Sequence, residues 1–141
     1  MAALEAGLAG ARVIIADEQC EFGGTLLASN EKFDGQSAND WLVAIFSQLS
    51  SLRNVKCLTR STVFGYYDHN FLTILERRTD HLGITASSEP RQCMHRVRAK
   101  QVVLATGALE RPLVFAHNDI PGVMQASSVS TYINRFSVAP G

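Results

Sequence analysis

The sequence lacks the features that identify several large classes of protein. Its formal net charge is zero, with 13 basic and 13 acidic side chains in 141 residues, so no excess of positive charge indicates nucleic acid as a partner. It has no apolar run of about 20 residues, the length that a membrane-spanning helix needs. Its first residues include Glu5 and no basic cluster, unlike a secretory signal peptide. We therefore expect a cytoplasmic protein that binds neither nucleic acid nor membrane.

Residues typical of metal and redox sites are scarce and widely spaced. The three cysteines, Cys20, Cys57 and Cys93, form no Cys-x-x-Cys pair, and we expect three ordinary thiols. No Ser/His/Asp constellation or nucleophile elbow is visible, so the sequence predicts no catalytic residue. The histidines also lack metal-ligand spacing, so no metal is predicted; they are His69, His81, His95 and His117.

The sequence does contain enough apolar material for one folded domain, since 46% of its residues are hydrophobic. Residues 2–9 read as the end of a helix that Gly10 terminates. The β-branched run 12–16 predicts a strand buried on both faces of a parallel sheet. Residues 38–52 have the periodicity of an amphipathic helix. Ser37 and Asp40 in front of it resemble a capping box in which Asp replaces the usual Glu.

The second half alternates strands with one long loop. Residues 54–58 predict a further sheet strand, and the runs 62–67, 71–76 and 94–98 predict an antiparallel meander. Residues 77–92 are polar and read as a loop, which the apolar strand 101–105 and a helix over 126–136 follow. Alternating strands and helices favour an α/β fold with a parallel sheet. The meander before the Ala-Thr-Gly stretch points to the dinucleotide fold of flavoprotein disulfide reductases.

Asp17 is the leading candidate for a cofactor-binding residue. It ends the apolar run 13–16, and a carboxylate at that place in a dinucleotide fold accepts hydrogen bonds from both hydroxyls of the adenosine ribose. Its charge would repel a 2′-phosphate, so NADP is disfavoured. Glu18 takes the role if the register shifts by one residue. The alternative is that Asp17 merely begins a turn.

The predicted cofactor-binding site also includes two stretches of small residues and the first residues of one strand. The pair of glycines six residues after Asp17 allows close approach of backbone amides to a phosphate or a ring. The Ala-Thr-Gly stretch lets the chain pass close to a cofactor, and the strand that begins at 62 offers backbone groups to adenine. A common turn and a simple strand start are the alternatives. The predicted cofactor-binding residues are Asp17, Glu18, Gly23, Gly24, Thr25, Thr62, Val63, Ala105, Thr106 and Gly107.

The glycine-rich turn Gly-x-Gly-x-x-Gly is absent from the sequence. In dinucleotide folds that turn presents backbone amides and a helix N-terminus to the pyrophosphate, and the strand that carries it precedes the acid-bearing strand. We therefore expect residues 1–141 to be a partial dinucleotide-binding domain that lacks its first strand and its C-terminal continuation. Cofactor binding should be weakened, and the sheet edge left by the missing strand should favour aggregation.

Longer stretches carry a family resemblance. They are residues 13–27 (VIIADEQCEFGGTLL), 64–70 (FGYYDHN) and 102–141 (VVLATGALERPLVFAHNDIPGVMQASSVSTYINRFSVAPG). In them the sequence resembles the α subunits of heterotetrameric sarcosine oxidases, whose relatives include the dinucleotide-binding subunits of bacterial amine, opine and proline dehydrogenases. The resemblance covers nearly the whole chain.

This resemblance implies a Rossmann-like FAD/NAD(P)-binding fold, truncated at both ends, in a multi-subunit flavoenzyme. Such enzymes oxidise sarcosine to glycine, formaldehyde (or methylene-tetrahydrofolate) and hydrogen peroxide. The family's α subunit binds NAD, the related dehydrogenases are taken to bind FAD there, and FMN lies at the α/β interface. The resemblance also implies β, γ and δ partner subunits and a small-molecule substrate, while this chain alone is expected to be inactive.

Three other interpretations stay open. The chain could belong to an amine, opine or proline dehydrogenase, or it could be a non-catalytic interaction module with a degenerate cofactor site. A nucleotide-binding methyltransferase also places an acid after its second strand, although the meander and the Ala-Thr-Gly stretch argue against it. The sequence does not distinguish NAD from FAD.

Overall fold

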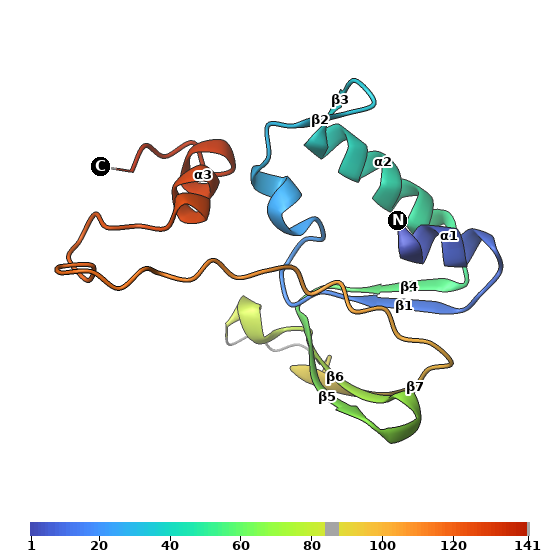
Figure 1. The fold of residues 1–141 in the computed structure, drawn as a ribbon. Helices are drawn as coiled ribbons and strands as arrows, with labels where there is room; N and C mark the ends of the chain where they lie inside the picture. The colour runs from blue at the N-terminus through green and yellow to red at the C-terminus, as the bar shows by residue number, and fades with distance from the viewer. Residues whose placement is uncertain (84–87, 141) are drawn as a thin grey trace. The chain divides into compact units, whose positions relative to one another are not determined.

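The computed structural model describes residues 1–83 and 88–140 (Figure 1), and these divide into two compact units. The first unit comprises Met1–Phe22 and Ile45–Leu104, and the second comprises Gly23–Ala44 and Ala105–Gly141. In chain order the elements are α1 (Ala2–Leu8), β1 (Val13–Ala16), η1 (Gly24–Ala28), β2 (Lys32–Phe33), β3 (Gln36–Ser37), α2 (Ala38–Ser51), β4 (Val55–Leu58), β5 (Ser61–Tyr67), η2 (Asp68–Asn70), β6 (Phe71–Arg77), η3 (Asp80–Leu82), β7 (Gln92–Arg98) and α3 (Ala126–Asn134).

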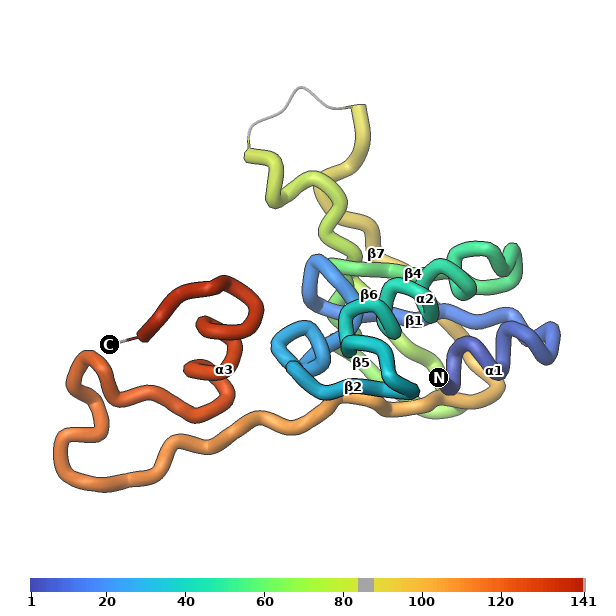
Figure 2. The backbone as a smooth tube through the Cα atoms, turned by 90° about the horizontal axis from the view of Figure 1, so that it is seen from above, coloured from blue at the N-terminus to red at the C-terminus, as the bar shows by residue number. Residues whose placement is uncertain are grey.

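A parallel strand pair and a short helix form one part of the first unit. Strands β1 and β4 pair in parallel and run side by side in both views (Figures 1 and 2). Helix α1 packs against β1 with Leu4 buried. Gly7 allows this approach, because a Cβ there would lie 2.7 Å from Cγ2 of Val55. The Asn54 side chain holds the end of the helix by donating to the carbonyls of Gly7 (2.8 Å) and Ala11 (2.7 Å).

The end of α1 confirms the predicted glycine cap. Gly10 has a φ of +85°, the left-handed conformation that glycine adopts without a steric penalty. The amide of Ala11 donates to the carbonyl of Ala6 (3.0 Å), and that of Gly10 donates to Gly7 (3.0 Å). This pair of hydrogen bonds is the Schellman motif, which satisfies carbonyls that the end of a helix leaves free.

The predicted antiparallel meander is confirmed. Its strands follow the order β5-β6-β7, with a bulge in β5 between Val63 and Gly65. Leu72 and Ile74 of β6 lie on one face of this sheet and are buried. Alternation of side chains along a strand puts the two on the same face, so this face contributes to the core of the unit.

Strand β1 is less buried than the sequence predicts. Ile14 is 44% exposed, and no residue of the strand is fully buried. Within the described residues β1 has one hydrogen-bonded neighbour, β4. The prediction of burial on both faces was therefore wrong, because such burial needs helices or strands packed on each side of a wider sheet.

The second unit contains a short hairpin that the sequence analysis did not predict. Strands β2 and β3 pair through a two-residue turn, in which Asp34 and Gly35 have φ values of 50° and 80°. Positive φ at both central residues is the mark of a type I′ turn, for which Asp-Gly is a favoured sequence. The signal was present, but each strand has only two residues and so no periodicity.

The start of α2 supports the predicted capping box in a modified form. The Ser37 hydroxyl oxygen accepts a hydrogen bond from the Asp40 amide (3.1 Å), as an N-cap does. The same hydroxyl donates to the carboxylate of Asp40 (2.7 Å). Further along, Trp41 packs at a tilt on Phe33, with ring centroids 5.5 Å apart. Helix α3 confirms the last predicted helix.

Residues 101–105 do not form the predicted strand. The described segment from 99 to 115 has neither helix nor strand, and Val103 and Leu104 are 72% and 71% exposed. An extended segment becomes a strand only when its amides and carbonyls pair with a neighbour, and none of the described strands pairs with this one. The prediction recognised the apolar run but presumed a partner strand.

Candidate dinucleotide site

Asp17 lies at the carboxyl end of β1, where the sequence analysis placed it. Its amide extends the parallel pairing by donating to the carbonyl of Leu58 (2.9 Å). Its side chain is half-buried, and Oδ1 accepts a hydrogen bond from the Gln19 amide (2.9 Å). This is an Asx turn, so Asp17 begins the turn that follows β1. In the part of the chain that the structure describes, Oδ2 accepts no hydrogen bond and keeps its acceptor capacity.

The first residues of β5 lie beside Asp17. The amide of Ser61 donates to the carbonyl of Asp17 (2.8 Å), and Ser61 is buried. Thr62 and Val63 follow directly and pair with β6. Strand β5 is an edge strand among the described residues, so alternate backbone groups along it point away from β6. The structure thus brings Asp17 together with Thr62 and Val63, from sequence positions 45 or more residues apart.

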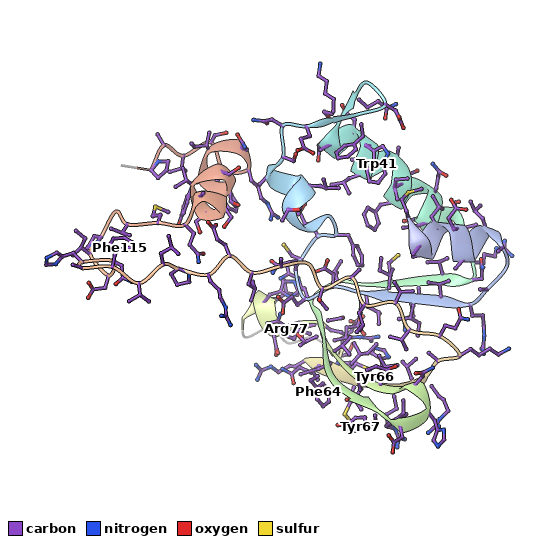
Figure 3. All side chains as sticks on the ribbon, in the orientation of Figure 1. Trp41, Phe64, Tyr66, Tyr67, Arg77 and Phe115 are labelled. Carbon is purple, nitrogen blue, oxygen red and sulfur yellow. The ribbon has the colours of Figure 1, made fainter. Side chains whose placement is uncertain are left out.

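Arg77 is a residue of this region that the sequence analysis did not single out. Its guanidinium donates to the carbonyl of Glu18 (3.2 Å), and its amide donates to the carbonyl of Arg60 (3.0 Å). Arg77 is labelled where β6 ends in Figure 3. Glu18 itself is exposed. The sequence did not predict the charge of Arg77 beside the turn after β1. Its position depends on how the strands pair and not on the spacing of residues along the chain.

The glycine pair belongs to the second unit and has a structural role there. Gly23 has a φ of +139°, and a Cβ on it would lie 2.8 Å from Cδ1 of Leu42 and 2.9 Å from Cγ of Leu27. Gly24 has a φ of +54° and begins η1, with no atom within 4 Å of the place a Cβ would occupy. Thr25 is exposed. Two successive positive φ values require glycine-like residues whether or not a cofactor is present.

Ala105, Thr106 and Gly107 also lie in the second unit. All three are exposed and belong to the segment without regular structure. Gly107 has a φ of +70°, so the chain turns there in a conformation that favours glycine. In this structure the stretch is accessible backbone, and its cofactor-binding role stays a prediction.

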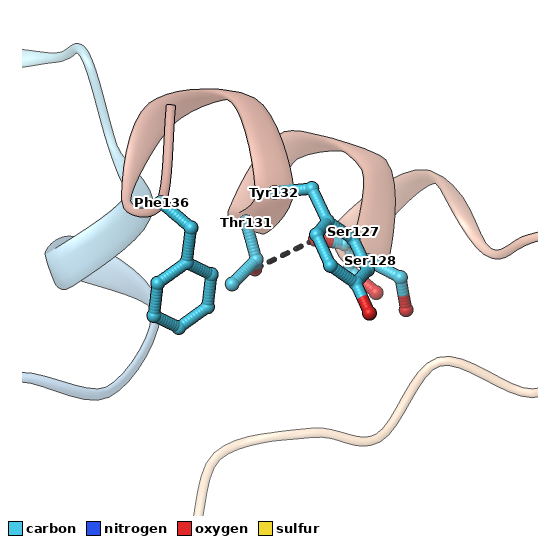
Figure 4. Close-up of a pocket in the computed structure, with 5 residues that line it drawn as sticks. All are labelled: Ser127, Ser128, Thr131, Tyr132 and Phe136. Atoms are coloured by element: carbon cyan, nitrogen blue, oxygen red, sulfur yellow. Dashed lines mark hydrogen bonds between the residues drawn. The ribbon is translucent and has the colours of Figure 1, made fainter. Parts of the chain in front are cut away.

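A shallow pocket lies along α3, within the second unit (Figure 4). The hydroxyl of Thr131 in its wall donates to the carbonyl of Ser127 (2.8 Å). The Ser127 amide in turn donates to the Glu110 carboxylate (2.9 Å). A hydrogen bond from the Ser127 side chain, together with the one from its amide, holds the pKa of Glu110 below its ordinary value. The residues that line the pocket are Ser127, Ser128, Thr131, Tyr132 and Phe136.

Glu76 is a further charged residue with a perturbed carboxyl group. Partial burial acts to raise its pKa, but hydrogen bonds from His95 and Arg78 outweigh burial and leave the pKa below its ordinary value. The contacts to Glu76 Oε2 measure 2.7 Å from His95 Nε2 and 3.2 Å from Arg78 Nε. Glu76 is therefore ionised at neutral pH.

The comparisons with known proteins agree with the resemblance seen in the sequence. No family model matches the chain. The α subunit of sarcosine oxidase from Corynebacterium sp. (strain U-96) is 49% identical over 99% of this chain, and that from Rhizobium meliloti (strain 1021) is 47% identical over 99%. The chain spans only 15% and 14% of the length of these subunits. An opine oxidase subunit from Agrobacterium tumefaciens (strain Ach5) is 28% identical over 99% of the chain, which spans 27% of that protein.

One solved structure supports the predicted fold class. L-proline dehydrogenase from P. horikoshii superimposes with a TM-score of 0.75 and 25% identity, over 99% of this chain and 26% of that one. The predictions of an α/β dinucleotide fold with a parallel sheet and an antiparallel meander, and of similarity to sarcosine oxidase α subunits, are thus confirmed. Within the described residues no helix is long and apolar enough to cross a membrane.

Proposed function

We propose that this chain, which is similar over 99% of its length to sarcosine oxidase α subunits, supplies part of the dinucleotide-binding domain of an amine-oxidising enzyme. Asp17 would accept the hydroxyls of the adenosine ribose, and the backbone at Thr62 and Val63 would contact the adenine. The observation that carries the proposal is the 2.8 Å hydrogen bond from the Ser61 amide to the Asp17 carbonyl. This hydrogen bond holds Asp17 next to the start of β5. The two must lie together if the acid is to contact the ribose and the strand the adenine of one nucleoside.

The surroundings of Asp17 fit an adenosine ribose. Hydrogen bonds to Leu58 and from Ser61 engage both the amide and the carbonyl of Asp17, so the carboxylate is positioned before any ligand arrives. Oδ1 is already bonded to the Gln19 amide, while Oδ2 accepts no hydrogen bond from the described residues. A carboxylate oxygen has two acceptor positions, so this side chain retains the capacity for ribose hydroxyls. The full charge beside the 2′ position favours NAD or FAD over NADP.

The relatives suggest the class of reaction. They are named as sarcosine oxidase, opine oxidase and proline dehydrogenase, so they are oxidoreductases whose named substrates are secondary amines. We propose sarcosine as the substrate of the complete enzyme, in which a nicotinamide or flavin would supply the redox chemistry. The β, γ and δ subunits are the proposed partners, with FMN at the α/β interface. This chain alone would bind a nucleotide without turning over an amine.

A nucleotide titration of the purified chain tests the proposal. NAD and FAD are titrated separately, with quenching of the fluorescence of Trp41, the sole tryptophan, or of the flavin as the readout. Asp17→Asn should raise the dissociation constant about 10- to 100-fold, because hydrogen bonds to a charged group contribute about 1.5–3 kcal/mol. Asp68→Asn is the matched control, since Asp68 is an exposed acid in the turn before β6 and should leave binding unchanged.

The absorbance spectrum of any ligand released on denaturation distinguishes the two cofactors. A flavin spectrum identifies FAD, whereas NAD binding without released flavin identifies NAD. The proposal is wrong if neither nucleotide binds to folded protein, or if Asp17→Asn binds as tightly as the unmodified chain. Binding that Asp17→Asn and Asp68→Asn weaken equally would also contradict it.

A further inference from the structure

Three potential metal ligands meet across strands β6 and β7 of the meander. Glu76 and Cys93 are directly opposed in the antiparallel register. His95 stands two residues after Cys93, so alternation along the strand places both side chains on the same face. The Glu76 Oε, Cys93 Sγ and His95 ring nitrogen atoms all lie within 4.8 Å of one another. His95 Nε2 lies 2.7 Å from Glu76 Oε2.

The cluster sits on the partly buried face of this sheet. Leu72 and Ile74, on the same face of β6 as Glu76, are buried. The side chains of Glu76 and His95 are each 19% exposed, and Cys93 is also half-buried. The three ligand atoms are therefore held by a paired sheet and partly shielded from water, while one side stays open to solvent.

The donor types in the cluster match those of zinc. Thiolate sulfur, imidazole nitrogen and carboxylate oxygen are its three ordinary protein ligands, and three of them with one water complete a tetrahedral shell. We propose that Glu76, Cys93 and His95 form a Zn²⁺-binding site whose fourth position is open to water. Binding replaces the proton of the Cys93 thiol with the metal and releases that proton to solvent. This proposal departs from the expectation, drawn from sequence spacing, that the cysteines and histidines hold no metal.

Arg78 is the competitor for the same carboxylate. Its Nε lies 3.2 Å from Glu76 Oε2, the oxygen that His95 also contacts. Zn²⁺ must share Glu76 with this guanidinium or displace it. Arg78→Gln, which removes the positive charge from the cluster, should therefore tighten binding severalfold, since like charges near a site oppose a cation.

A cobalt titration of the reduced, metal-free chain tests the proposal. Co²⁺ takes the place of Zn²⁺ and reports its ligands, because a thiolate bound to Co²⁺ gives a near-ultraviolet charge-transfer band. We expect saturation at one Co²⁺ per chain, and displacement of the cobalt by Zn²⁺. Cys93→Ser should abolish the band. His95→Gln should weaken affinity by more than about 100-fold, since even outer partners of metal ligands contribute about 10- to 100-fold.

Cys57→Ser and Cys20→Ser are the matched controls, because both thiols are free, exposed and outside the cluster. Their bands should be unchanged, and circular dichroism of every variant should match that of the unmodified chain. A missing cobalt band in folded protein would overturn the proposal. A band that survives Cys93→Ser, or one that Cys57→Ser removes, would do so as well. Should Cys93→Ser fail to fold, the proposal is tested by the other two variants. It then requires that His95→Gln lose affinity for Co²⁺ and that Arg78→Gln gain it.

The zinc site does not depend on the proposed nucleotide function. Asp17 is not among the three metal ligands, and Asp17→Asn should leave the cobalt band intact. NAD or FAD binding should in turn be unaffected by Cys93→Ser. Each experiment therefore fails or succeeds without reference to the other.

Discussion

The glycine pair of the second unit allows a direct test of whether the absence of a side chain there serves packing or a cofactor. Gly23→Ala and Gly24→Ala add the same methyl group to adjacent residues, both of which have a positive φ. At Gly23 the new Cβ would lie 2.8 Å from Leu42 Cδ1 and 2.9 Å from Leu27 Cγ, closer than real Cβ atoms come to such neighbours. At Gly24 it would meet nothing within 4 Å.

The structure therefore predicts unequal losses of stability. Gly24→Ala incurs only the left-handed backbone penalty, about 1–2 kcal/mol. Gly23→Ala incurs a backbone penalty of about 1–3 kcal/mol at its φ of +139°. It also overpacks the leucine side chains, which costs about 1–3 kcal/mol more. We expect a total loss of about 2–6 kcal/mol, a large part of the 5–15 kcal/mol that a typical domain possesses.

Urea unfolding followed by tryptophan fluorescence measures both losses. Trp41 is the sole tryptophan, and it packs on Phe33 within the same unit as the two glycines. The free energy of unfolding should fall at least about 1 kcal/mol further for Gly23→Ala than for Gly24→Ala, without a change in slope. Equal losses, or a greater loss for Gly24→Ala, would refute the packing argument. A large effect on nucleotide binding with unchanged stability would instead favour a cofactor role for the glycines.

Two further predictions concern a buried core residue and the start of α3. Leu49→Ala should lower the free energy of unfolding by about 2–5 kcal/mol, because Leu49 is 2% exposed and its loss leaves a cavity. Val43→Ala on the same helix should change it by less than about 0.5 kcal/mol, since Val43 is 63% exposed; equal losses in urea would contradict the assignment. Ser127 lowers the pKa of Glu110, so the ionised carboxylate stabilises the start of α3. This stabilisation is complete above the ordinary pKa of a glutamate, about 4.3, and is lost as the pH falls through the lowered pKa of Glu110. An acid titration of helical circular dichroism should show this step, and Glu110→Gln should remove it; an unchanged step in that variant would assign it to another group.

Local sequence pattern predicted most of the secondary structure because the relevant forces act over a few residues. The amphipathic helix α2, the glycine that ends α1 and the short strand-forming runs of the meander each have their own signal in the sequence. The local pattern did not correctly predict the burial of β1 or the structure of residues 101–105. Both depend on hydrogen-bonded neighbours, and the apolar character of Val103 and Leu104 records a tendency to pair without supplying the partner.

The candidate sites show the same division between local and cross-strand information. Asp17 became a candidate because it ends an apolar run, and Thr62 because it begins one. Arg77 and Glu76 were missed, since their contacts with Glu18 and His95 arise from pairing between strands. The alternate positions of Cys93 and His95 were the only local signal of the cluster. Two potential metal ligands on one face of a strand indicate a metal site only when the strand register places a third ligand opposite them.

Recognition of the ribose and binding of the pyrophosphate depend on different parts of a dinucleotide fold, and Asp17 belongs to the first. Its backbone is paired with Leu58 on one strand and Ser61 on another, so the orientation of the acid depends on the β1–β4 pair and the start of β5. Pyrophosphate binding in dinucleotide folds depends instead on a glycine-rich turn, and the sequence has no Gly-x-Gly-x-x-Gly. In the proposed function the chain supplies the group that recognises the ribose, and this contribution is separate from that of the phosphate contacts. Under that proposal, preference for an unmodified 2′-hydroxyl would persist even where affinity is low, because the Asp17 charge would set the preference and the phosphate contacts would set the affinity.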